Sequence, residues 1–322
     1  MEMGGIDGEL VESWRMDDEM ALPLVRLWCE VLEDRNPMYH DDDYATRSRH
    51  RGIVAPGPML LPLTTRPEWT PEGSVSSTSQ GLSHEYPEYP HAASLSTVQY
   101  YHRPMRLGER PWIHWFQGPT SEETMTERGP GLIIPRYYSF RDTRDEEIAG
   151  YRIDQLRYRQ LSKAEPKAPP HPLRGRSAPP LSDGQSRSWQ DIEVGDVLAP
   201  ITLPITLKRC IKWVAATRDF YEVHHDADFA RAAGEPDLFI GVHFAHGLMG
   251  RCGTDWSGPE GELRELNFNA HGRVYLGEDF TVQGRVSRLF RESGETRVDL
   301  ELTGSTARAL THSANLIMFV PD

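Results

Sequence analysis

The sequence is poor in cysteine and contains no long hydrophobic run. Its three cysteines, Cys29, Cys210 and Cys252, are widely spread over 322 residues. This number and spacing do not suit a disulfide framework, so we expect ordinary buried thiols. No segment approaches the roughly 18 consecutive apolar residues that a membrane-spanning helix requires. The first residues also lack the basic and apolar parts of a signal peptide. These absences predict a soluble, cytoplasmic protein with no membrane partner.

Several motifs of familiar enzyme classes are also missing. The chain has no glycine-rich phosphate loop, no dinucleotide fingerprint, no Gly-x-Ser-x-Gly elbow and no helical His-x-x-x-His pair. Its 48 acidic residues outnumber its 35 basic residues, which gives a net charge of −13. Such an acidic balance argues against a nucleic-acid coat and against polybasic membrane binding. We therefore expect no cofactor, no metal and no nucleic-acid partner.

One stretch separates the chain into two halves. Residues 162–187 are rich in proline, glycine, serine and basic residues, a composition that is typical of a semi-rigid linker. The length of the chain also suits two domains. We expect a first domain over residues 1–161 and a second domain over residues 188–322.

The two halves follow the same plan. Each begins with apolar residues at helical spacing, and the first of these segments follows Pro23, a residue favoured in a first helical turn. Each segment leads into an acidic loop with histidine, at 33–42 and 217–228, and then into an apolar turn with glycine, at 52–60 and 238–249. The apolar helical positions are Leu24, Leu27, Trp28, Val31, Leu32 and, in the second half, Leu207, Cys210, Ile211, Val214 and Ala215. This repetition predicts that the halves are distant copies of one fold.

Strands follow the helical segments in both halves. The segments 102–113 and 271–282 align without a gap, and each has a Leu-Gly-Glu turn that enters a strand. Val298, Leu300 and Leu302 alternate with charged residues, as in a half-buried antiparallel strand. Further strands are expected at 133–140, 148–156 and 316–320. We predict an α+β fold in which two antiparallel sheets each wrap a central helix.

The loop after the second helix carries the residues best suited to chemistry. Asp219 and His224 are five positions apart, and a loop can aim both side chains into one cavity. A carboxylate and an imidazole that hold one water between them suit general acid–base catalysis. A loop whose acids and histidines are merely solvated would have the same spacing. His224, His225, Asp226 and Asp228 also resemble a metal cluster, but adjacent histidines point in different directions, so we do not favour a metal site.

The glycine turn of the second half is a candidate site for a negative charge. Gly241 and Val242 precede a helical stretch at 243–252, and the N–H groups at a helix start suit a developing oxyanion. A turn that simply needs glycine would have the same sequence. His243 and His246 lie three positions apart, and we expect them to pack or to line a pocket rather than to bind a metal.

These loops resemble those of a known family. The MaoC-like (R)-specific enoyl-thioester hydratase and dehydratase family has the hydratase motif Asp-x-Asn-Pro-x-His, and residues 219–224 read Asp-Phe-Tyr-Glu-Val-His. The first half keeps Asp-Arg-Asn-Pro at residues 34–37 but has Tyr39 at the position of the histidine. The surrounding sequence resembles an actinobacterial branch that includes the steroid side-chain enoyl-CoA hydratase. The chain looks like a fusion of the two partners of that enzyme, which implies a double hot-dog fold.

The resemblance implies roles for particular residues. Asp219 and His224 would be the catalytic pair, and the backbone N–H of Gly241 or Val242 would hold the thioester carbonyl. The first half would shape the pocket for a bulky or long acyl group. The substrate-binding positions would be Tyr221, His243, Asn36 and Tyr39.

The leading hypothesis is an (R)-specific 2-enoyl-thioester hydratase and 3-hydroxyacyl dehydratase. Its substrate would be carried by CoA or by an acyl carrier protein, and the protein would be a monomer or a homodimer. One alternative is a thioesterase of the same fold, which would rely on an acid on the central helix. The other is a non-catalytic acyl-binding or partner protein, because the first half lacks the histidine and the second half lacks Asn-Pro.

Overall fold

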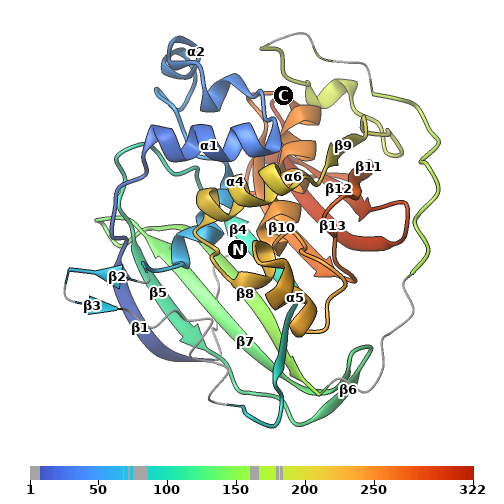
Figure 1. Cartoon of the computed structure of the whole chain (residues 1–322). Helices are drawn as coiled ribbons and strands as arrows, with labels where there is room; N and C mark the ends of the chain where they lie inside the picture. Colours follow the sequence, from blue (N-terminus) through green and yellow to red (C-terminus); the bar gives the residue numbers. More distant parts are fainter. Residues whose placement is uncertain are drawn as a thin grey trace.

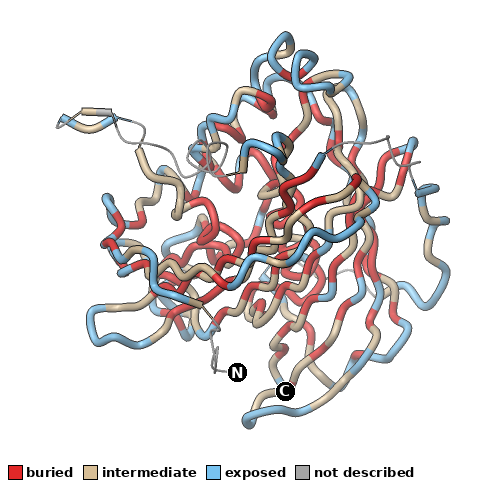
Figure 2. Tube along the Cα trace, turned by 90° about the horizontal axis from the view of Figure 1, so that it is seen from below, coloured by how far each residue is buried: buried red, intermediate tan, exposed pale blue. Residues whose placement is uncertain are grey.

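The structure is a computed structural model that describes residues 8–67, 69–71, 73–74, 86–159, 167–178, 181 and 184–322. The expected linker at 162–187 and the expected end of the first domain at residue 161 lie partly or wholly outside the described residues. Buried residues gather in the middle of the molecule, and exposed residues follow the outer loops (Figure 2). Within the described part, no helix is both long and apolar enough to cross a membrane.

The first half is built from helical segments followed by strands. Its helical segments are α1 (Leu22–Leu32), η1 (Pro37–Tyr39), α2 (Asp42–Arg47) and η2 (Gly57–Thr64). Its strands are β1 (Glu9–Arg15), β2 (Trp69–Thr70), β3 (Gly73–Ser74), β4 (His91–Tyr101), β5 (Trp112–Gln117), β6 (Thr124–Thr126), β7 (Gly129–Arg141) and β8 (Glu147–Tyr158).

The second half repeats this order. Its helical segments are η3 (Trp189–Asp191), α4 (Leu207–Thr217), η4 (Glu222–His224), α5 (Ala227–Ala232) and α6 (Val242–Ser257). Its strands are β9 (Ile201–Pro204), β10 (Glu262–Ala270), β11 (Asp279–Glu292), β12 (Glu295–Ser305) and β13 (Leu310–Phe319). The strands expected around Val298 and at 133–140, 148–156 and 316–320 are all present.

The repeat is clearest at the first helix of each half. α1 and α4 both contain 11 residues, and each ends at a residue with left-handed backbone, Glu33 with a φ of 55° and Arg218 with a φ of 57°. A one-turn 3-10 helix and a short α-helix follow in both halves. The rings of Trp28 and Trp213 pack with their centroids 4.6 Å apart where α1 meets α4. The two halves are therefore joined by contacts between equivalent helices.

The buried face of α4 differs from the one that the spacing predicts. Leu207 and Ile211 are 48% and 54% exposed, whereas Trp213 is almost fully buried. The indole of Trp213 packs against Trp28 and, edge to face, against Phe244 of α6. The large aromatic ring thus decides which side of α4 faces the core, because it buries more apolar surface than the aliphatic side chains.

The sheets of the two halves join edge to edge into one large antiparallel sheet, and β2 and β3 form a small sheet of their own. The strand order is β1-β5-β7-β8-β4-β10-β13-β12-β11-β9, and β6 pairs with β7. The halves meet where β4 pairs with β10, from Tyr100 opposite Glu265 to Ser96 opposite Asn269. This pairing satisfies the backbone N–H and C=O groups that two open sheet edges would leave free. Figure 1 shows β4, β5, β7 and β8 of the first half in teal to light green and β10 to β13 of the second half in orange to red.

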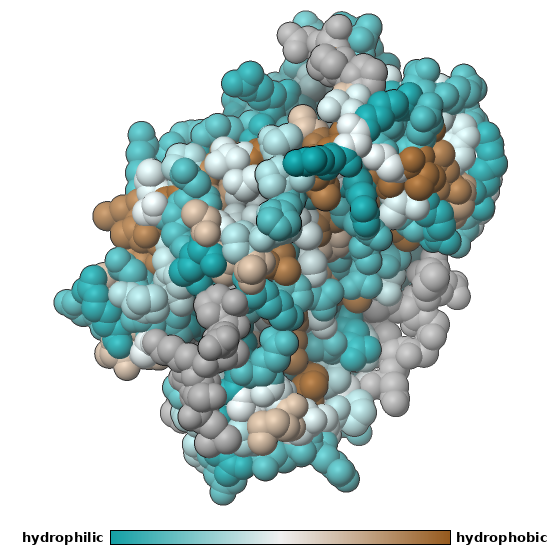
Figure 3. Space-filling view, turned by 90° about the vertical axis from the view of Figure 1, so that its right-hand side faces the viewer, coloured by the Kyte–Doolittle hydropathy of each residue, from teal (hydrophilic) through white to brown (hydrophobic). Residues whose placement is uncertain are grey.

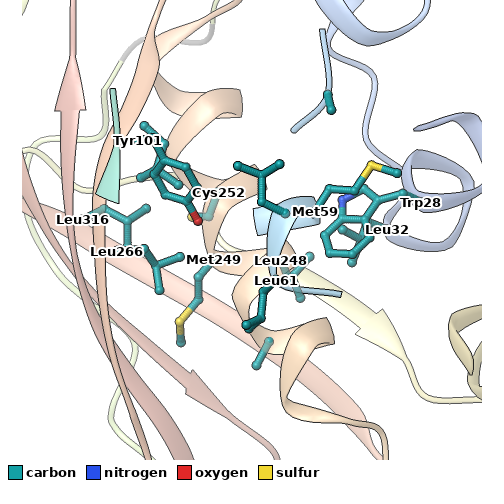
Figure 4. Close-up of a cluster of buried hydrophobic side chains, with 14 of the residues drawn as sticks. Trp28, Leu32, Met59, Leu61, Tyr101, Leu248, Met249, Cys252, Leu266 and Leu316 are labelled. Atoms are coloured by element: carbon teal, nitrogen blue, oxygen red, sulfur yellow. The ribbon is translucent and has the colours of Figure 1, made fainter. Parts of the chain in front are cut away.

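Among the described residues, only those of the second half form a long central helix. α6 contains 16 residues, most of them buried, and extends the stretch that we predicted at 243–252. Figure 4 shows Leu248, Met249 and Cys252 of α6 among core side chains from both halves. In the first half the corresponding place holds η2, an eight-residue 3-10 segment that contains Pro62. Proline lacks the N–H that an α-helix needs, which explains why no second central α-helix forms there.

Two further features are the burial of the cysteines and the distribution of apolar side chains on the surface. Cys29, Cys210 and Cys252 are buried free thiols, as we expected. On the face shown in Figure 3, the apolar side chains of the described residues form separate small groups among hydrophilic residues. Loose apolar groups of this kind are ordinary on a folded protein.

We expect Gly250→Ala to destabilise the protein. Alanine normally stabilises a helix by about 1 kcal/mol relative to glycine. Here the new Cβ would lie 2.7 Å from Cγ of Pro58, so overpacking should lower the free energy of unfolding by about 1–3 kcal/mol. Denaturant unfolding of Gly250→Ala, Pro58→Ala and the double variant would measure the effect. An equal loss in both backgrounds would show that the contact with Pro58 is not the cause.

Two histidines of the core are held neutral by burial. His246 of α6 is fully buried, and its Nε2 lies 2.9 Å from Oγ1 of Thr97 in β4. His312 of β13 packs against Phe268 and Phe280. Burial lowers the pKa of His246 well below its usual value and lowers the pKa of His312 to about 3. Both imidazoles therefore act as apolar or hydrogen-bonding side chains in the folded protein.

The stability of the fold should decrease when the pH falls below the pKa of a free histidine, about 6.5. Below that pH the unfolded chain binds protons that buried His312 does not bind, so the free energy of unfolding decreases by about 1.4 kcal/mol per pH unit for each such histidine. Denaturant unfolding at pH 7.5 and 5.5 measures this slope. His312→Phe should have a smaller slope than the wild type, and an unchanged slope would contradict the assignment.

Candidate active site

The site is built on the loop that connects α4 to α6. The left-handed residue Arg218 ends α4 and turns the chain, so that Asp219 leaves the helix axis. The 3-10 turn η4 then returns His224 to the interior, where it is 8% exposed. Asp226 caps α5 by accepting hydrogen bonds from the N–H groups of Asp228 and Phe229. The local backbone thus brings Asp219 and His224 together, as the sequence predicts.

The geometry fixes which nitrogen of His224 can act as a base. Nδ1 of His224 lies 2.8 Å from the carbonyl oxygen of Phe239. A carbonyl only accepts hydrogen bonds, so Nδ1 carries the proton and Nε2 of the neutral ring has a free lone pair. Nε2 lies 3.5 Å from Oδ2 of Asp219. The two acceptor atoms are therefore close enough that one donor molecule beside them can reach both.

Gly241 closes this space from the side of α6. A Cβ at Gly241 would lie 3.1 Å from Oδ2 of Asp219 and 3.4 Å from Nε2 of His224. The backbone of Gly241 has a φ of −63°, which any residue can adopt. Glycine is thus required here for space rather than for backbone conformation. It leaves the carboxylate and the imidazole open at the start of a helix.

The start of α6 adds a positive potential to the site. Gly241 is the N-cap residue and has no side-chain cap. The first N–H groups of an α-helix, including that of Val242, have no partner within the helix. Together with the helix dipole they favour a negative charge at this point. The structure places the predicted glycine turn beside the predicted pair.

His243 lies against the same carboxylate. Its Nδ1 is 3.7 Å from Oδ2 of Asp219, and within the described part of the chain this buried nitrogen has no hydrogen-bond partner. Burial lowers the pKa of His243, while the carboxylate of Asp219 opposes this shift and His224 adds to it. Asp219 therefore lies between two imidazoles.

Tyr221 forms the outer wall of the site. Its ring is 46% exposed and meets the rings of His224 and Phe229 edge to face, at 6.1 Å and 6.0 Å between centroids. Burial raises the pKa of its hydroxyl. The motif thus has an aromatic side chain where the family has asparagine.

Asn36 and Tyr39 lie elsewhere. Both line a pocket between the first half and the middle of α6, and none of Asp219, His224 or Gly241 contributes to it. Oδ1 of Asn36 caps η1 by accepting from the N–H of Met38, while the N–H of Asn36 donates to Oδ1 of Asp34. The two first-half positions that we expected in the substrate site are therefore separated from the Asp219–His224 pair.

The neighbouring histidines support the alignment of the two loops. His40 places Nε2 2.6 Å from the carbonyl oxygen of Asp34, and His225 places Nε2 2.9 Å from the carbonyl oxygen of Phe220. These histidines are equivalent, so Tyr39 stands where His224 stands in the second half. His40 is not a displaced catalytic histidine.

The possible metal cluster does not form. His224 and His225 turn to different carbonyl groups, and Asp226 caps a helix. In the part of the chain that the structure describes, no group of three or more potential ligands could hold a metal ion.

Sequence reasoning missed two partners of the site. The carbonyl of Phe239 orients His224, and a backbone carbonyl has no sequence signal. The ring of Phe239 is itself covered by the guanidinium of Arg273, 4.3 Å from its centroid, and Arg273 is paired with Glu235. Charged residues that steady an aromatic ring look like solvated residues in the sequence.

Comparisons with known proteins find relatives among hydratase subunits. The chain is 34% identical over 94 residues to the 3-oxo-4,17-pregnadiene-20-carboxyl-CoA hydratase beta subunit of Mycobacterium tuberculosis, a match that covers 29% of the chain and 73% of that subunit. It is 28% identical over 176 residues to a probable enoyl-CoA hydratase alpha subunit of Thermomonospora curvata, which covers 52% of the chain and 54% of that protein. The chain thus spans about half the length of this alpha subunit. No family model matches the chain.

Solved structures share the fold over the whole chain. A MaoC-like dehydratase superposes with a TM-score of 0.72 at 15% identity and covers 99% of this chain and 100% of its own. A conserved hypothetical protein of Mycobacterium tuberculosis with a double hotdog fold superposes with a TM-score of 0.58 at 10% identity, covering 97% of this chain and 96% of its own. At these identities the likeness establishes the fold, and the α+β double hot-dog prediction is confirmed. Together with the beta-subunit relative, it shows that the chain belongs to the MaoC-like enoyl-CoA hydratase and dehydratase family.

Proposed function

We propose that the protein is an (R)-specific 2-enoyl-thioester hydratase and 3-hydroxyacyl-thioester dehydratase. The observation that carries the proposal is the convergence of the Asp219 carboxylate and the His224 imidazole at the start of α6, with 3.5 Å between Oδ2 and Nε2. The named relatives act as hydratases or hydratase subunits on CoA thioesters, which supports the same reaction class for this chain. The carrier is CoA or the equivalent arm of an acyl carrier protein.

In hydration, a water molecule between Asp219 and His224 donates one hydrogen bond to each. Its oxygen attacks C3 of the enoyl group as the pair removes one proton, and a proton is then delivered to C2. The elements of water are thus added across the double bond, and dehydration is the reverse. General acid–base catalysis of this type contributes about 10²–10⁴-fold to the rate.

The start of α6 stabilises the charge that builds during the reaction. Addition at C3 places negative charge on the thioester oxygen, and the N–H of Gly241 or Val242 is the proposed donor to that oxygen. A fixed donor at such an oxygen contributes about 3 kcal/mol to transition-state stabilisation. His243 and Tyr221 border the same space and would contact the bound thioester.

The proposed stereochemistry requires attack on one face of the enoyl group. Asp219 and His224 act from one side of the bound enoyl group, so the oxygen can reach only one face of C3. We assign the (R) product to this face because the motif resembles that of the (R)-specific family. A bulky or long acyl group is supported by the first half, where the eight residues of η2 replace the 16 residues of a helix such as α6.

The thioesterase alternative has less support. It requires an acid on the central helix near the reacting carbonyl. Along α6, all of whose residues are described, Asp255 is the only carboxylate, and it lies in the last turn paired with Arg251 at 3.0 Å. The pair at the opposite end of α6 is better suited to activate water for addition to a double bond.

Asp219→Asn and His224→Ala should each lower hydration by at least about 100-fold, because each removes one acceptor of the water proton. The assay follows the loss of enoyl-thioester absorbance with acyl groups from crotonyl to long-chain and steroid-like. Chiral chromatography of the hydrolysed product tests the (R) assignment. Asp228→Asn, a matched change at an exposed carboxylate, should keep full activity.

Three results would overturn this proposal. Full activity in both Asp219→Asn and His224→Ala would exclude the pair as the catalytic centre. Release of free thiol from a saturated acyl-CoA would favour a thioesterase. Tight binding of enoyl-CoA without turnover for every acyl group would favour a non-catalytic acyl-binding protein.

Gly241→Ala should also reduce hydration, by about 10–100-fold, with little change in stability. The new methyl group would occupy the space between Asp219 and His224, and small displacements of reacting groups cost about this much. The matched control is Gly272→Ala, whose Cβ would have no neighbour closer than 3.8 Å. Assays and thermal unfolding of both variants make the comparison. Equal activities would show that Gly241 is a simple turn residue.

A further inference from the structure

The first half contains a pocket at the position equivalent to the active site. It lies between the loop that holds Asp34 and Tyr39, the start of η2 at Gly57, and the middle of α6 around Gly250. The equivalents of these first-half groups are Asp219, His224 and Gly241. None of those three residues lines this pocket.

The end of the pocket is polar, and at its inner loop a phenol stands where the second-half site has an imidazole. Tyr39 is 7% exposed, and within the described part of the chain its hydroxyl has no hydrogen-bond partner. Burial raises the pKa of this hydroxyl well above its usual value, and the nearby carboxyl of Asp34 adds to the shift. A neutral phenol can donate a hydrogen bond to a carbonyl but does not remove a proton from water. The pocket can therefore hold a polar group at Tyr39 but does not repeat the Asp219–His224 pair.

The walls between the polar end and the surface are mostly apolar. They include Met38, Val54 and Pro58 from the first half and Leu263 from β10. On the side of α6, Gly250 lies so close to Pro58 that a Cβ would overlap its ring. The helix therefore narrows this pocket where it passes Pro58. A slender, largely neutral arm fits such a channel better than a bulky acyl group.

The outer end of the channel opens into a basic groove. The two share His50, Arg103 and Glu262, and the groove continues to Arg106 and Arg264. The guanidinium of Arg106 is exposed and has no ion-pair partner within the described residues. The groove also contains Glu295. Arg103 is paired with Glu109 and Asp142, and Arg264 is paired with Glu262 and Glu295, so Arg106 supplies the positive charge that remains for a ligand. Guanidinium groups bind phosphates in preference to other anions because their N–H groups match the phosphate oxygens.

We propose that this channel, the first-half pocket together with its basic groove, is a second, non-catalytic binding site for the phosphopantetheine arm of coenzyme A. The phosphates lie at Arg106 in the groove, the arm follows the apolar walls, and its thiol or thioester end reaches the hydroxyl of Tyr39. The inference stands on the pocket and its charges and does not depend on turnover at Asp219 and His224. A phosphopantetheine group on a carrier protein has the same chemistry and is distinguished by the test.

The test counts coenzyme A sites by calorimetry in the full chain, with Asp219→Asn as the background so that nothing is turned over. We expect two sites per chain. Arg106→Glu should weaken one of them by at least about 10-fold, since charge reversal replaces attraction of a phosphate by repulsion, and should leave the KM for crotonyl-CoA in the otherwise wild-type chain unchanged. The matched control is Arg26→Glu, at an exposed arginine of α1 outside both pockets, which should leave both sites unchanged.

A second variant separates the arm from the phosphates. Tyr39→Phe keeps the ring and removes the hydroxyl, and it should weaken both coenzyme A and pantetheine at the second site several-fold. Arg106→Glu should not affect pantetheine, which has no phosphate. If a carrier protein with its arm binds this site more tightly than coenzyme A, and Arg106→Glu weakens both, the source of the arm is the carrier protein.

Two outcomes would overturn the proposal. A single coenzyme A site that neither Arg106→Glu nor Tyr39→Phe weakens would show that the first-half channel binds no such arm. An equal rise of KM and of the coenzyme A dissociation constant in Arg106→Glu would show that the groove is the entrance to the active site. If the assays find no hydratase activity but coenzyme A still binds in a way that depends on Arg106, the proposed function fails and the second site stands.

Discussion

The close packing of α6 against both halves is the constraint on which the rest of the structure depends. Gly247 and Gly250 let the helix approach Trp28 and Pro58 of the first half, and Gly253 lets it approach Leu316 and Met318 of the second-half sheet. A helix fixed on two sides has a fixed start. The position of Gly241, and with it the space between Asp219 and His224, follows from contacts made along the whole length of α6.

The same helix explains why the two equivalent loops have different uses. At its start α6 offers free N–H groups to the loop of Asp219, whereas its middle closes the loop of Asp34. The carboxyl of Asp34 is buried, and this burial raises its pKa to about 6. With Tyr39 in place of a histidine, the first-half loop keeps the shape of the second-half loop without its carboxylate–imidazole pair.

Much of this arrangement could be predicted from the sequence, but its long-range parts could not. Asp219, His224 and Gly241 were brought together correctly because their spacing is set by local turns. The pairing of β4 with β10 had no signal, since β4 buries Thr97 and Gln99 and does not alternate between polar and apolar residues. The face of α4 was misjudged because Trp213 outweighs Ile211 in the core. The separation of Tyr39 from the pair depends on the position of α6, which spacing along the chain does not contain.

The joint between β4 and β10 has a consequence for how such a protein can change. In an assembly of two identical chains, every substitution appears twice, once on each side of the symmetry axis. Here both sides of the joint belong to one chain, so the pairing does not weaken on dilution, and each side accumulates its own substitutions. Tyr39 and His224 can therefore occupy equivalent positions in the same molecule. Because the two halves belong to one chain, their equivalent positions can hold different residues. The shared sheet still holds the halves together.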